Sequence, residues 1–438
     1  WRTSIQPNQA VELDKNQQRF LVFADKGNFS NTLVAALQAK GQDVLIVQAG
    51  PSFQAKSEQL FEINLGARKD YHQLVEQLSD KGWMIDQVLH CATVDQEVSV
   101  VNEQDHADTL TEGYLGLSFL GQALAGQKQQ IQLTVFTNHL AKVTRADRTE
   151  PLKATLLAPT RILPLEVNQL KAKLVDVQSP TPDQEAVEQL LNEIYYSSDE
   201  SFVAYRYKER WIESFYALEE DERTHSEVAI QPGGTYLLTG GFGGMGLTIA
   251  SDLIRHYAAE VIVLHRSPFP PREVWDDWLE GHGEEERTSR KILRIRDAET
   301  SGGRLHFYQV DLQQEEKVTE VLTEIKLKHQ DLKGIIWAAG VVDYGGIIQK
   351  RDREELLRYT ASKIQALRQF EKIIDFASLD FISLFSSMGN VFYQNKFGQV
   401  AYNAANEFLE KYSAYAIAKY ATHAFTINWC DWLNTGMA

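Results

Sequence analysis

The 438-residue sequence predicts an α/β protein with two doubly wound domains. Its length exceeds what one hydrophobic core usually organises, so two domains are expected. Both halves begin with a strand, a turn, a helix and a second strand, and this alternation predicts parallel sheets with helical crossovers. A polar, acidic stretch at residues 219–227 suits a surface linker between the halves. We therefore expect domains at residues 1–220 and 221–438.

The predicted elements of the first half follow the order of a doubly wound sheet. A strand at 19–24 precedes a helix at 32–40 and a second strand at 43–47. Two apolar runs further along, at 87–90 and 133–137, predict additional strands of the same sheet.

The second half repeats this plan and adds an insertion. A strand at 235–239, a glycine-rich turn and a helix at about 246–257 are followed by a strand at 261–264. Later strands of this half are predicted at 304–310, 334–337, 381–385 and 424–428. Residues 268–303 are rich in charge, proline and tryptophan, and we expect them to form an inserted helical segment.

Composition excludes several classes of function. The net charge of −16 would repel nucleic acids and anionic membranes. With Cys91 and Cys430 as the only cysteines, and with His90 and His265 at strand ends without acidic neighbours, we expect neither a disulfide framework nor a metal site. No apolar run approaches the roughly 18 residues of a membrane span. The opening residues resemble neither a natural start nor a signal peptide, so we expect a cytoplasmic fragment of a longer protein.

A glycine-rich turn predicts a dinucleotide site in the second half. The turn contains G-x-G-x-x-G between a predicted strand and a predicted helix. Glycines there let a pyrophosphate approach backbone N–H groups at the positive end of the helix. The candidate contacts are Gly240, Gly241, Gly243, Gly244, Met245 and Gly246.

The equivalent turn of the first half lacks these features. Residues 24–30 contain one glycine, and Asp25 stands where a phosphate would lie. Desolvating a carboxylate beside a phosphate is unfavourable. We expect the first domain to be a degenerate Rossmann-like domain that keeps the fold without the cofactor.

Residues after the other strands of the second half extend the predicted cofactor site. Arg266 follows the strand at 261–264, where an acid would select NAD and an arginine can pair with the 2′-phosphate of NADPH. Further along, Asp311 and Leu312 are candidates for the adenine end. The small residues Ala338, Ala339 and Gly340 are candidates to pass beneath the nicotinamide ribose.

A candidate catalytic set lies near the end of the chain. Reduction of a ketone by hydride needs a proton donor for the developing alkoxide and a hydrogen-bond donor to the carbonyl. Ser387 ends a predicted strand, whereas Tyr402 and Asn406 share one face of the helix that follows. A tyrosine can donate the proton if a nearby cation and the cofactor lower its pKa.

These residues resemble the short-chain dehydrogenase/reductase superfamily, and specifically the ketoreductase domains of modular polyketide synthases. Most members of the superfamily carry Tyr-x-x-x-Lys, whereas here Asn406 stands in place of the lysine. Polyketide ketoreductases place that lysine on the preceding helix, where Lys363 matches it. The resemblance implies that Tyr402 donates the proton, Ser387 holds the carbonyl oxygen, Lys363 supports the tyrosine and the proton supply, and Asn406 organises the relay.

The resemblance covers nearly the whole chain. Residues 156–166, and residues 203–206 together with 210–211, are similar to the structural subdomain of these ketoreductases. Residues 428–438 are similar to the region near the end of their catalytic subdomain. One stereochemical class has Leu-Asp-Asp where this chain has 341–344, which keeps Asp343 alone of the two acids. The opposite class often has a tryptophan eight residues before the catalytic tyrosine, where this chain has Gln394, so neither stereochemical signature of the family is complete.

The loop between Ser387 and Tyr402 is slightly longer than is usual in this family. Either the loop bulges and Ser387 keeps its role, or Ser386 or Asn390 contributes instead. We favour Ser387, because the preceding strand should fix its direction.

The resemblance implies NADPH-dependent reduction of a β-keto acyl thioester on an acyl carrier protein, within a synthase whose neighbouring domains are further partners. Three alternatives stay open: an α-keto thioester in a hybrid or depsipeptide synthetase, a small-molecule dehydrogenase of the same superfamily, and a catalytically silent scaffold domain. The intact Ser387, Tyr402 and Lys363 argue against the last.

Overall fold

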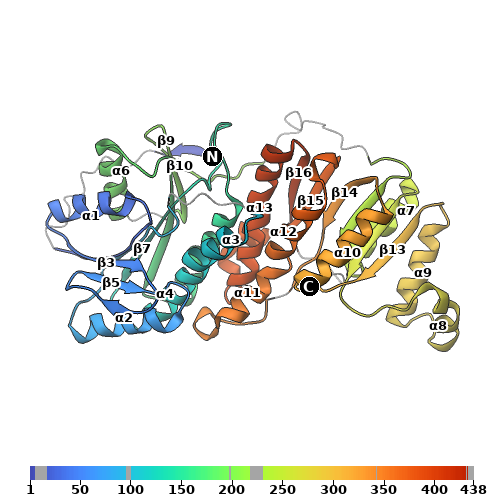
Figure 1. Ribbon diagram of the computed structural model, residues 1–438, viewed down its shortest axis with the longest axis horizontal. Coiled ribbons are helices and arrows are strands. Elements are labelled where there is room, and N and C mark those ends of the chain that lie inside the picture. Colours follow the sequence, from blue (N-terminus) through green and yellow to red (C-terminus); the bar gives the residue numbers. More distant parts are fainter. Residues whose placement is uncertain are drawn as a thin grey trace. The chain divides into compact units, whose positions relative to one another are not determined.

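A computed structural model describes residues 1–4, 17–94, 100–196, 199–217, 230–341, 343–430 and 432. The predicted linker at 219–227 lies outside the described residues, as does most of the chain end at 431–438. The chain divides into two compact units (Figure 1). The first unit contains Trp1–Leu218, Asp343–Leu356 and Val391–Lys411, and the second contains Glu219–Val342, Leu357–Asn390 and Tyr412–Ala438. The domain boundary near residue 220 stays a prediction, and the units differ from it by the two segments 343–356 and 391–411.

The first unit is built on a ten-stranded sheet in the order β1-β10-β9-β8-β7-β6-β2-β3-β5-β4. The strands from β9 to β5 in this order run parallel, and the outer pairings, β1 with β10, β10 with β9 and β4 with β5, are antiparallel. The strands are β1 Arg2–Ser4, β2 Arg19–Phe23, β3 Asp43–Ala49, β4 Gln54–Ala55, β5 Leu60–Ile63, β6 Gln87–His90, β7 Ile131–Asn138, β8 Leu170–Val177, β9 Phe202–Arg206 and β10 Glu209–Ile212.

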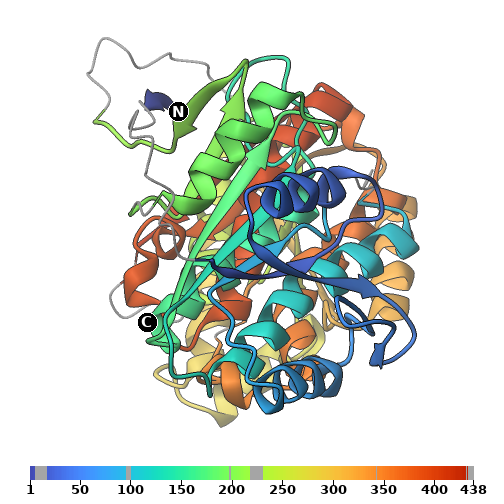
Figure 2. The same cartoon turned by 90° about the vertical axis from the view of Figure 1, so that its left-hand side faces the viewer.

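Helices cover both faces of this sheet, as a doubly wound fold requires. Apolar side chains of α1 and α6 share one core, while α2 packs with α4 and α4 with α5. Figure 2 shows helix ribbons on the two sides of this sheet. The helices are α1 Phe29–Ala39, α2 Arg68–Asp80, α3 Glu103–Thr109, α4 Gly116–Leu124, α5 Leu157–Glu166 and α6 Gln184–Tyr195, with a π-helical segment at Leu110–Leu115 and a 3-10 segment at Pro151–Leu156.

The second unit contains a six-stranded parallel sheet in the order β13-β12-β11-β14-β15-β16. The order reverses between β11 and β14, which makes this edge the switch point of a Rossmann sheet. The strands are β11 Thr235–Thr239, β12 Glu260–His265, β13 Arg304–Gln309, β14 Leu332–Trp337, β15 Phe381–Ser387 and β16 His423–Trp429.

In the second unit α7 packs with α9, and α10 packs with α12 (Figure 1). Their bounds are α7 Gly244–Tyr257, α8 Trp275–Gly281, α9 Arg287–Glu299, α10 Glu315–Lys328 and α12 Ile364–Ile373. Two further helices, α11 Arg353–Ala361 and α13 Val400–Tyr420, contribute residues to both units. No helix in the described part of the chain is both long and apolar enough to span a membrane.

The predicted fold class, two Rossmann-like α/β domains, is confirmed, and the predicted insertion is helical. Trp275 of the insertion is buried, stacks on Phe307 and donates its Nε1–H to the carbonyl of Pro270 at 2.9 Å. The sequence did not predict β5, β8, β9 and β10. In β8 the apolar pattern is broken by Lys173, which is buried because its ammonium pairs with Glu193 at 2.9 Å.

The segments 343–356 and 391–411 depend on the first half of the chain for their packing. Gln122 on α4 donates to the carbonyls of Ile348 and Arg351 at 2.6 and 2.8 Å, and the hydroxyl of Tyr114 donates to the carbonyl of Leu356 at 3.4 Å. These groups are buried, so they would lose their hydrogen bonds without the first half.

We therefore expect a truncated chain that begins at Ile230 to aggregate. Removal of the first half would expose the apolar surfaces of the two segments and leave their buried carbonyls without donors. Size-exclusion chromatography of the truncated chain beside the full chain measures this. A monomeric truncated chain with a cooperative thermal transition would contradict the expectation.

Candidate active site

The glycine-rich turn connects β11 to the N-terminus of α7, as the sequence predicted. Gly240 has a φ of +73°, which favours glycine. A Cβ on Gly241 would lie 2.3 Å from the Val263 side chain, and a Cβ on Gly246 would lie 2.5 Å from the Gly240 carbonyl oxygen. These two glycines let strand, turn and helix pack closely.

Gly243 is the N-cap of α7 and is exposed. The first N–H groups of any helix have no partner within it, and those of α7 begin at Gly244, Met245 and Gly246. A helix N-terminus with no side chain covering its first residue fits a pyrophosphate. The turn therefore fits the predicted dinucleotide.

In the first unit, a carboxylate occupies the equivalent position. Asp25 accepts hydrogen bonds from the backbone N–H groups of Phe29 at 3.2 Å and Ser30 at 2.7 Å, at the start of α1. The neighbouring Lys26 pairs with Glu112 at 2.7 Å. The protein's own anion thus satisfies the helix N-terminus, which supports the prediction that the first domain keeps the fold without the cofactor.

The other predicted cofactor-binding residues lie along one edge of the second unit's sheet. Arg266 directly follows β12 and is exposed, and none of the described residues partners its guanidinium. Asp311 and Leu312 follow β13, and Ala338, Ala339 and Gly340 follow β14. The N–H of Ala339 donates to the Thr239 hydroxyl at 3.1 Å, which joins the ends of β14 and β11. Carboxyl ends of parallel strands at a switch point are where dinucleotides bind in such sheets.

Asp311 also has a local structural role. Its carboxylate accepts the N–H of Gln313 at 3.0 Å and so closes the turn after β13.

The sequence did not predict how the insertion supports the glycine turn. The ring of Phe242 lies 4.6 Å from His265 and 4.2 Å from Phe269, centroid to centroid, and Lys291 on α9 lies 5.9 Å from the centroid of Phe242. Phe242 is buried, and an aromatic residue inside a glycine-rich turn was the sequence signal that could have indicated this cluster.

Two of the predicted catalytic residues belong to the second unit. Ser387 is the last residue of β15, is almost fully buried, and its Oγ accepts the N–H of Gly389 at 3.0 Å. This bond uses an acceptor site of the hydroxyl, so the serine proton can still be donated to a carbonyl oxygen. Next to it, Ser386 accepts a hydrogen bond from the Asn390 side chain at 3.3 Å.

Lys363 contacts the same strand, β15. Its Nζ donates to the carbonyl of Phe385 at 3.0 Å, and burial lowers the pKa of its ammonium to about 7. The sequence placed Lys363 inside a helix, and this detail was wrong. It is the N-cap of α12, in the turn after α11, and this turn directs its side chain towards β15.

The other two predicted catalytic residues belong to the first unit, on α13. Tyr402 is half-buried, and Asn406, one helical turn later, is fully buried. The backbone N–H of Tyr402 donates to the carboxylate of Asp343 at 3.2 Å. The ammonium of Lys396 lies 5.8 Å from the centroid of the Tyr402 ring. The catalytic roles of Ser387, Lys363, Tyr402 and Asn406 stay predictions.

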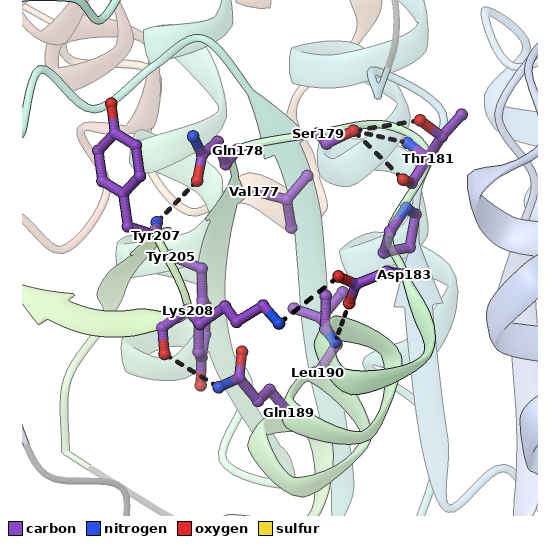
Figure 3. Close-up of a pocket in the computed structure, with 12 residues that line it drawn as sticks. Val177, Gln178, Ser179, Thr181, Asp183, Gln189, Leu190, Tyr205, Tyr207 and Lys208 are labelled. Atoms are coloured by element: carbon purple, nitrogen blue, oxygen red, sulfur yellow. Dashed lines mark hydrogen bonds and ion pairs between the residues drawn. The ribbon is translucent and has the colours of Figure 1, made fainter.

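A cavity of about 290 Å³ in the first unit holds none of the predicted site residues (Figure 3). It lies beside the ends of β8 and β9 and the start of α6, and its walls include Tyr205, Tyr207 and Lys208. The polar groups around it pair with one another, because Lys208 contacts Asp183 at 3.7 Å and Asp183 caps α6. Nothing in this arrangement supplies a catalytic set.

Two family models match the chain. The KR domain family matches residues 234–434, and the family described as "Beta-ketoacyl synthase-like, N-terminal" matches residues 18–196.

The curated relatives include polyketide and 6-methylsalicylic acid synthases. The polyketide synthase PksN of Bacillus subtilis is 26% identical over 300 residues, which are 67% of this chain and 5% of PksN. The 6-methylsalicylic acid synthase of Penicillium patulum is 30% identical over 208 residues, which are 47% of this chain and 11% of that synthase. The chain therefore spans only a small part of the length of these relatives.

Solved structures share the fold over nearly the whole chain. A ketoreductase from the macrolactin assembly line matches with a TM-score of 0.76 at 19% identity, covering 100% of this chain and 82% of that one. A multidomain structure of a keto acid-selecting NRPS module, which includes a ketoreductase, matches with a TM-score of 0.81 at 20% identity, covering 95% of this chain and 34% of that one.

The depressed pKa of Lys363 can be measured directly. We expect the ammonium of Lys363 to lose its proton near pH 7, because burial disfavours the charged form, whereas exposed lysines titrate at about 10.4. An NMR titration of protein labelled with ¹³C at the lysine side chains measures this, and Lys363→Arg identifies the resonance. If the resonance lost in Lys363→Arg titrates with the exposed lysines, the expectation is wrong.

Proposed function

We propose that the chain is a ketoreductase domain that reduces a β-keto acyl thioester on an acyl carrier protein with NADPH, because the KR domain family matches residues 234–434 and a polyketide synthase is among its relatives. The observation that carries this proposal is the second unit's sheet edge, where the open N-terminus of α7 and the exposed Arg266 accompany Ser387 and Lys363 at β15. The N-terminus of α7 and Arg266 suit a phosphorylated dinucleotide, whereas Ser387 and Lys363 suit a substrate carbonyl.

The proposed roles follow from the chemistry of each side chain. Gly243 to Gly246 hold the pyrophosphate and Arg266 holds the 2′-phosphate. NADPH, when bound, supplies the hydride that forms the new C–H bond. The hydroxyl of Ser387 donates a hydrogen bond to the carbonyl oxygen and stabilises the negative charge that develops there.

Tyr402 transfers its proton to that oxygen and completes the alcohol. Lys363 and Asn406 support the tyrosine and restore its proton. A lysine whose pKa is about 7 exchanges protons readily near neutral pH, which suits this role.

The proposed partners and location follow from the relatives. The substrate arrives on the phosphopantetheine arm of the carrier protein, neighbouring synthase domains flank the chain, and the synthase is cytoplasmic. Neither a nucleic acid nor a metal takes part in the proposed reaction.

An α-keto thioester is the second candidate substrate. The likeness to the structure from a keto acid-selecting NRPS module, at a TM-score of 0.81, is the observation that favours it. NADPH consumption with matched α-keto and β-keto pantetheine thioesters tests the two candidates side by side, and chiral analysis of the products gives the stereochemistry.

Tyr402→Phe should lower turnover by about 10²–10⁴-fold, the usual contribution of a general acid, and leave NADPH binding unchanged. Steady-state kinetics with a simple cyclic ketone and fluorescence titration of NADPH measure the two properties. Ser387→Ala should lower turnover less, because it removes a hydrogen bond but not the transferred proton.

Ser386→Ala and Asn390→Ala serve as matched variants on the same loop. If turnover falls in Ser386→Ala or Asn390→Ala but not in Ser387→Ala, Ser387 is not the carbonyl donor. Near-full activity of Tyr402→Phe would refute the proposed mechanism.

Arg266→Ala should remove most of the preference for NADPH over NADH. A charge-assisted contact with the 2′-phosphate contributes about 1.5–3 kcal/mol, so NADPH affinity should fall by roughly tenfold or more while NADH affinity stays constant. Titration of both cofactors with the parent and the variant measures this. Equal affinity of the parent for the two cofactors would show that Arg266 does not select NADPH.

A further inference from the structure

Helix α5 of the first half contacts both segments that surround Tyr402 in the first unit. The carboxylate of Glu166, the last residue of α5, accepts the N–H of Gly398 at 2.8 Å and the N–H of Ile348 at 2.5 Å. Gly398 has a φ of +77° and lies two residues before α13 begins. One side chain thus joins the segment 343–356 to the approach of the helix that carries Tyr402.

A buried ion pair continues this connection to Tyr402 itself. The guanidinium of Arg351, which is fully buried, pairs with Asp343 at 2.7 Å and donates to the carbonyl of Gly398 at 2.5 Å. The other oxygen of Asp343 accepts the backbone N–H of Tyr402 at 3.2 Å. Glu166 therefore binds the N–H of Gly398, and Arg351 binds its carbonyl. Asp343 binds the backbone N–H of Tyr402.

Arg161 on α5 contacts α13 at a residue on the C-terminal side of Tyr402. Its guanidinium donates to Glu407 of α13 at 2.5 Å and to Glu213 at 2.9 Å, and it lies 5.2 Å from the ring centroid of Tyr393. Arg161 and Glu407 are both buried. Because Gly398 and Glu407 bracket Tyr402 along the chain, α5 restrains the start of α13 at two points.

We propose that Glu166 and Arg161 are positioning residues, through which the degenerate first half sets the place of the proton donor Tyr402. This inference rests on the proposed function, since it assumes that Tyr402 is the acid. Neither residue needs to contact substrate or cofactor. Their effect on the reaction arises because an acid that is displaced by about 1 Å can lose roughly 100-fold in rate.

A purely structural role would give a different result from a positioning role. Buried carboxylates elsewhere in the first unit stabilise the fold without contacting the segments around Tyr402. Glu193 is such a group: it is buried and accepts hydrogen bonds from Lys173 at 2.9 Å and Arg210 at 2.7 Å. Glu193→Gln is therefore the matched control for Glu166→Gln.

The test compares Glu166→Gln and Arg161→Lys with Glu193→Gln in the full-length chain. The glutamine offers one carbonyl oxygen where the carboxylate served two N–H groups, and its amide N–H₂ would face the other donor. We expect kcat for a cyclic ketone to fall by about 10–100-fold in Glu166→Gln, with KM for NADPH unchanged. Glu193→Gln should lower Tm and leave kcat unchanged below its transition.

Hydrogen exchange followed by mass spectrometry supplies a readout that does not depend on activity. In Glu166→Gln the segments containing Ile348 and Gly398 should exchange faster than in the parent, while β2, β6 and β7 should not change. Glu193→Gln should leave both segments unchanged. If Glu166→Gln fails to fold, the same measurements on Arg161→Lys, with faster exchange expected around Glu407, decide the question.

Each outcome bears on the proposal. Unchanged exchange in both α5 variants would show that α5 does not restrain α13. Faster exchange with unchanged kcat, or a loss of kcat that Glu193→Gln reproduces, would show that the restraint does not position the acid. An inactive parent chain would instead refute the proposed function, and the positioning role with it, while the exchange data would still show whether α5 holds the two segments.

Discussion

The constraint on which much of this structure depends is that a buried charge must have partners. Moving an ionised side chain out of water costs several kcal/mol, and only hydrogen bonds or opposite charges offset this. The chain has an excess of acidic residues, and several of them are buried. Burial would raise the pKa of Glu193, but Arg210 and Lys173 hold it below its usual value. For Glu407, burial raises the pKa to about 8 despite Arg161.

The same constraint explains why the two Rossmann-like halves differ. In the second unit the N-cap of α7 is Gly243, and no side chain makes a capping hydrogen bond to the helix. In the first unit the carboxylate of Asp25 already accepts the N–H groups at the start of α1. A single acidic residue in the turn thus binds the N–H groups at the start of the helix, which favours the prediction that the first half keeps the fold without the cofactor. The first half instead contacts the segments 343–356 and 391–411, and its hydrogen bonds stabilise them.

The fold class and the edge that carries the proposed cofactor site could be predicted because they depend on local pattern. Short apolar runs, a glycine-rich turn and small residues after strands are visible in a single stretch of sequence. Strand β8 was missed because Lys173 interrupts its pattern, and its partner Glu193 lies on α6. A buried pair formed by residues distant in the sequence gives no local signal.

The same reasoning explains which site features the sequence could not give. The turn at Lys363 interrupts a segment whose composition suits a continuous helix, and the hydrogen bond to the carbonyl of Phe385 becomes visible only once β15 is in place. The contacts of Glu166 and Arg161 join α5 to residues more than half the chain away. In the sequence alone, Glu166 and Arg161 are distinguished only as members of the stretch 156–166, which is similar to a structural subdomain.

The described contacts also separate the residues proposed for chemistry from those that carry paired charges. Ser387, Tyr402 and Asn406 are uncharged polar side chains, and the pKa of Lys363 is brought by burial to about 7, where its charge is readily lost. A proton relay needs hydrogen-bonding groups that pass protons on and a group that can take up or lose a proton near neutral pH, and Lys363 meets the second need. Arg351 and Asp343 instead hold backbone groups in place, the carbonyl of Gly398 and the N–H of Tyr402. The backbone N–H of Tyr402, the proposed proton donor, is bound by the carboxylate of Asp343, so a buried ion pair directly contacts the residue proposed for the chemistry.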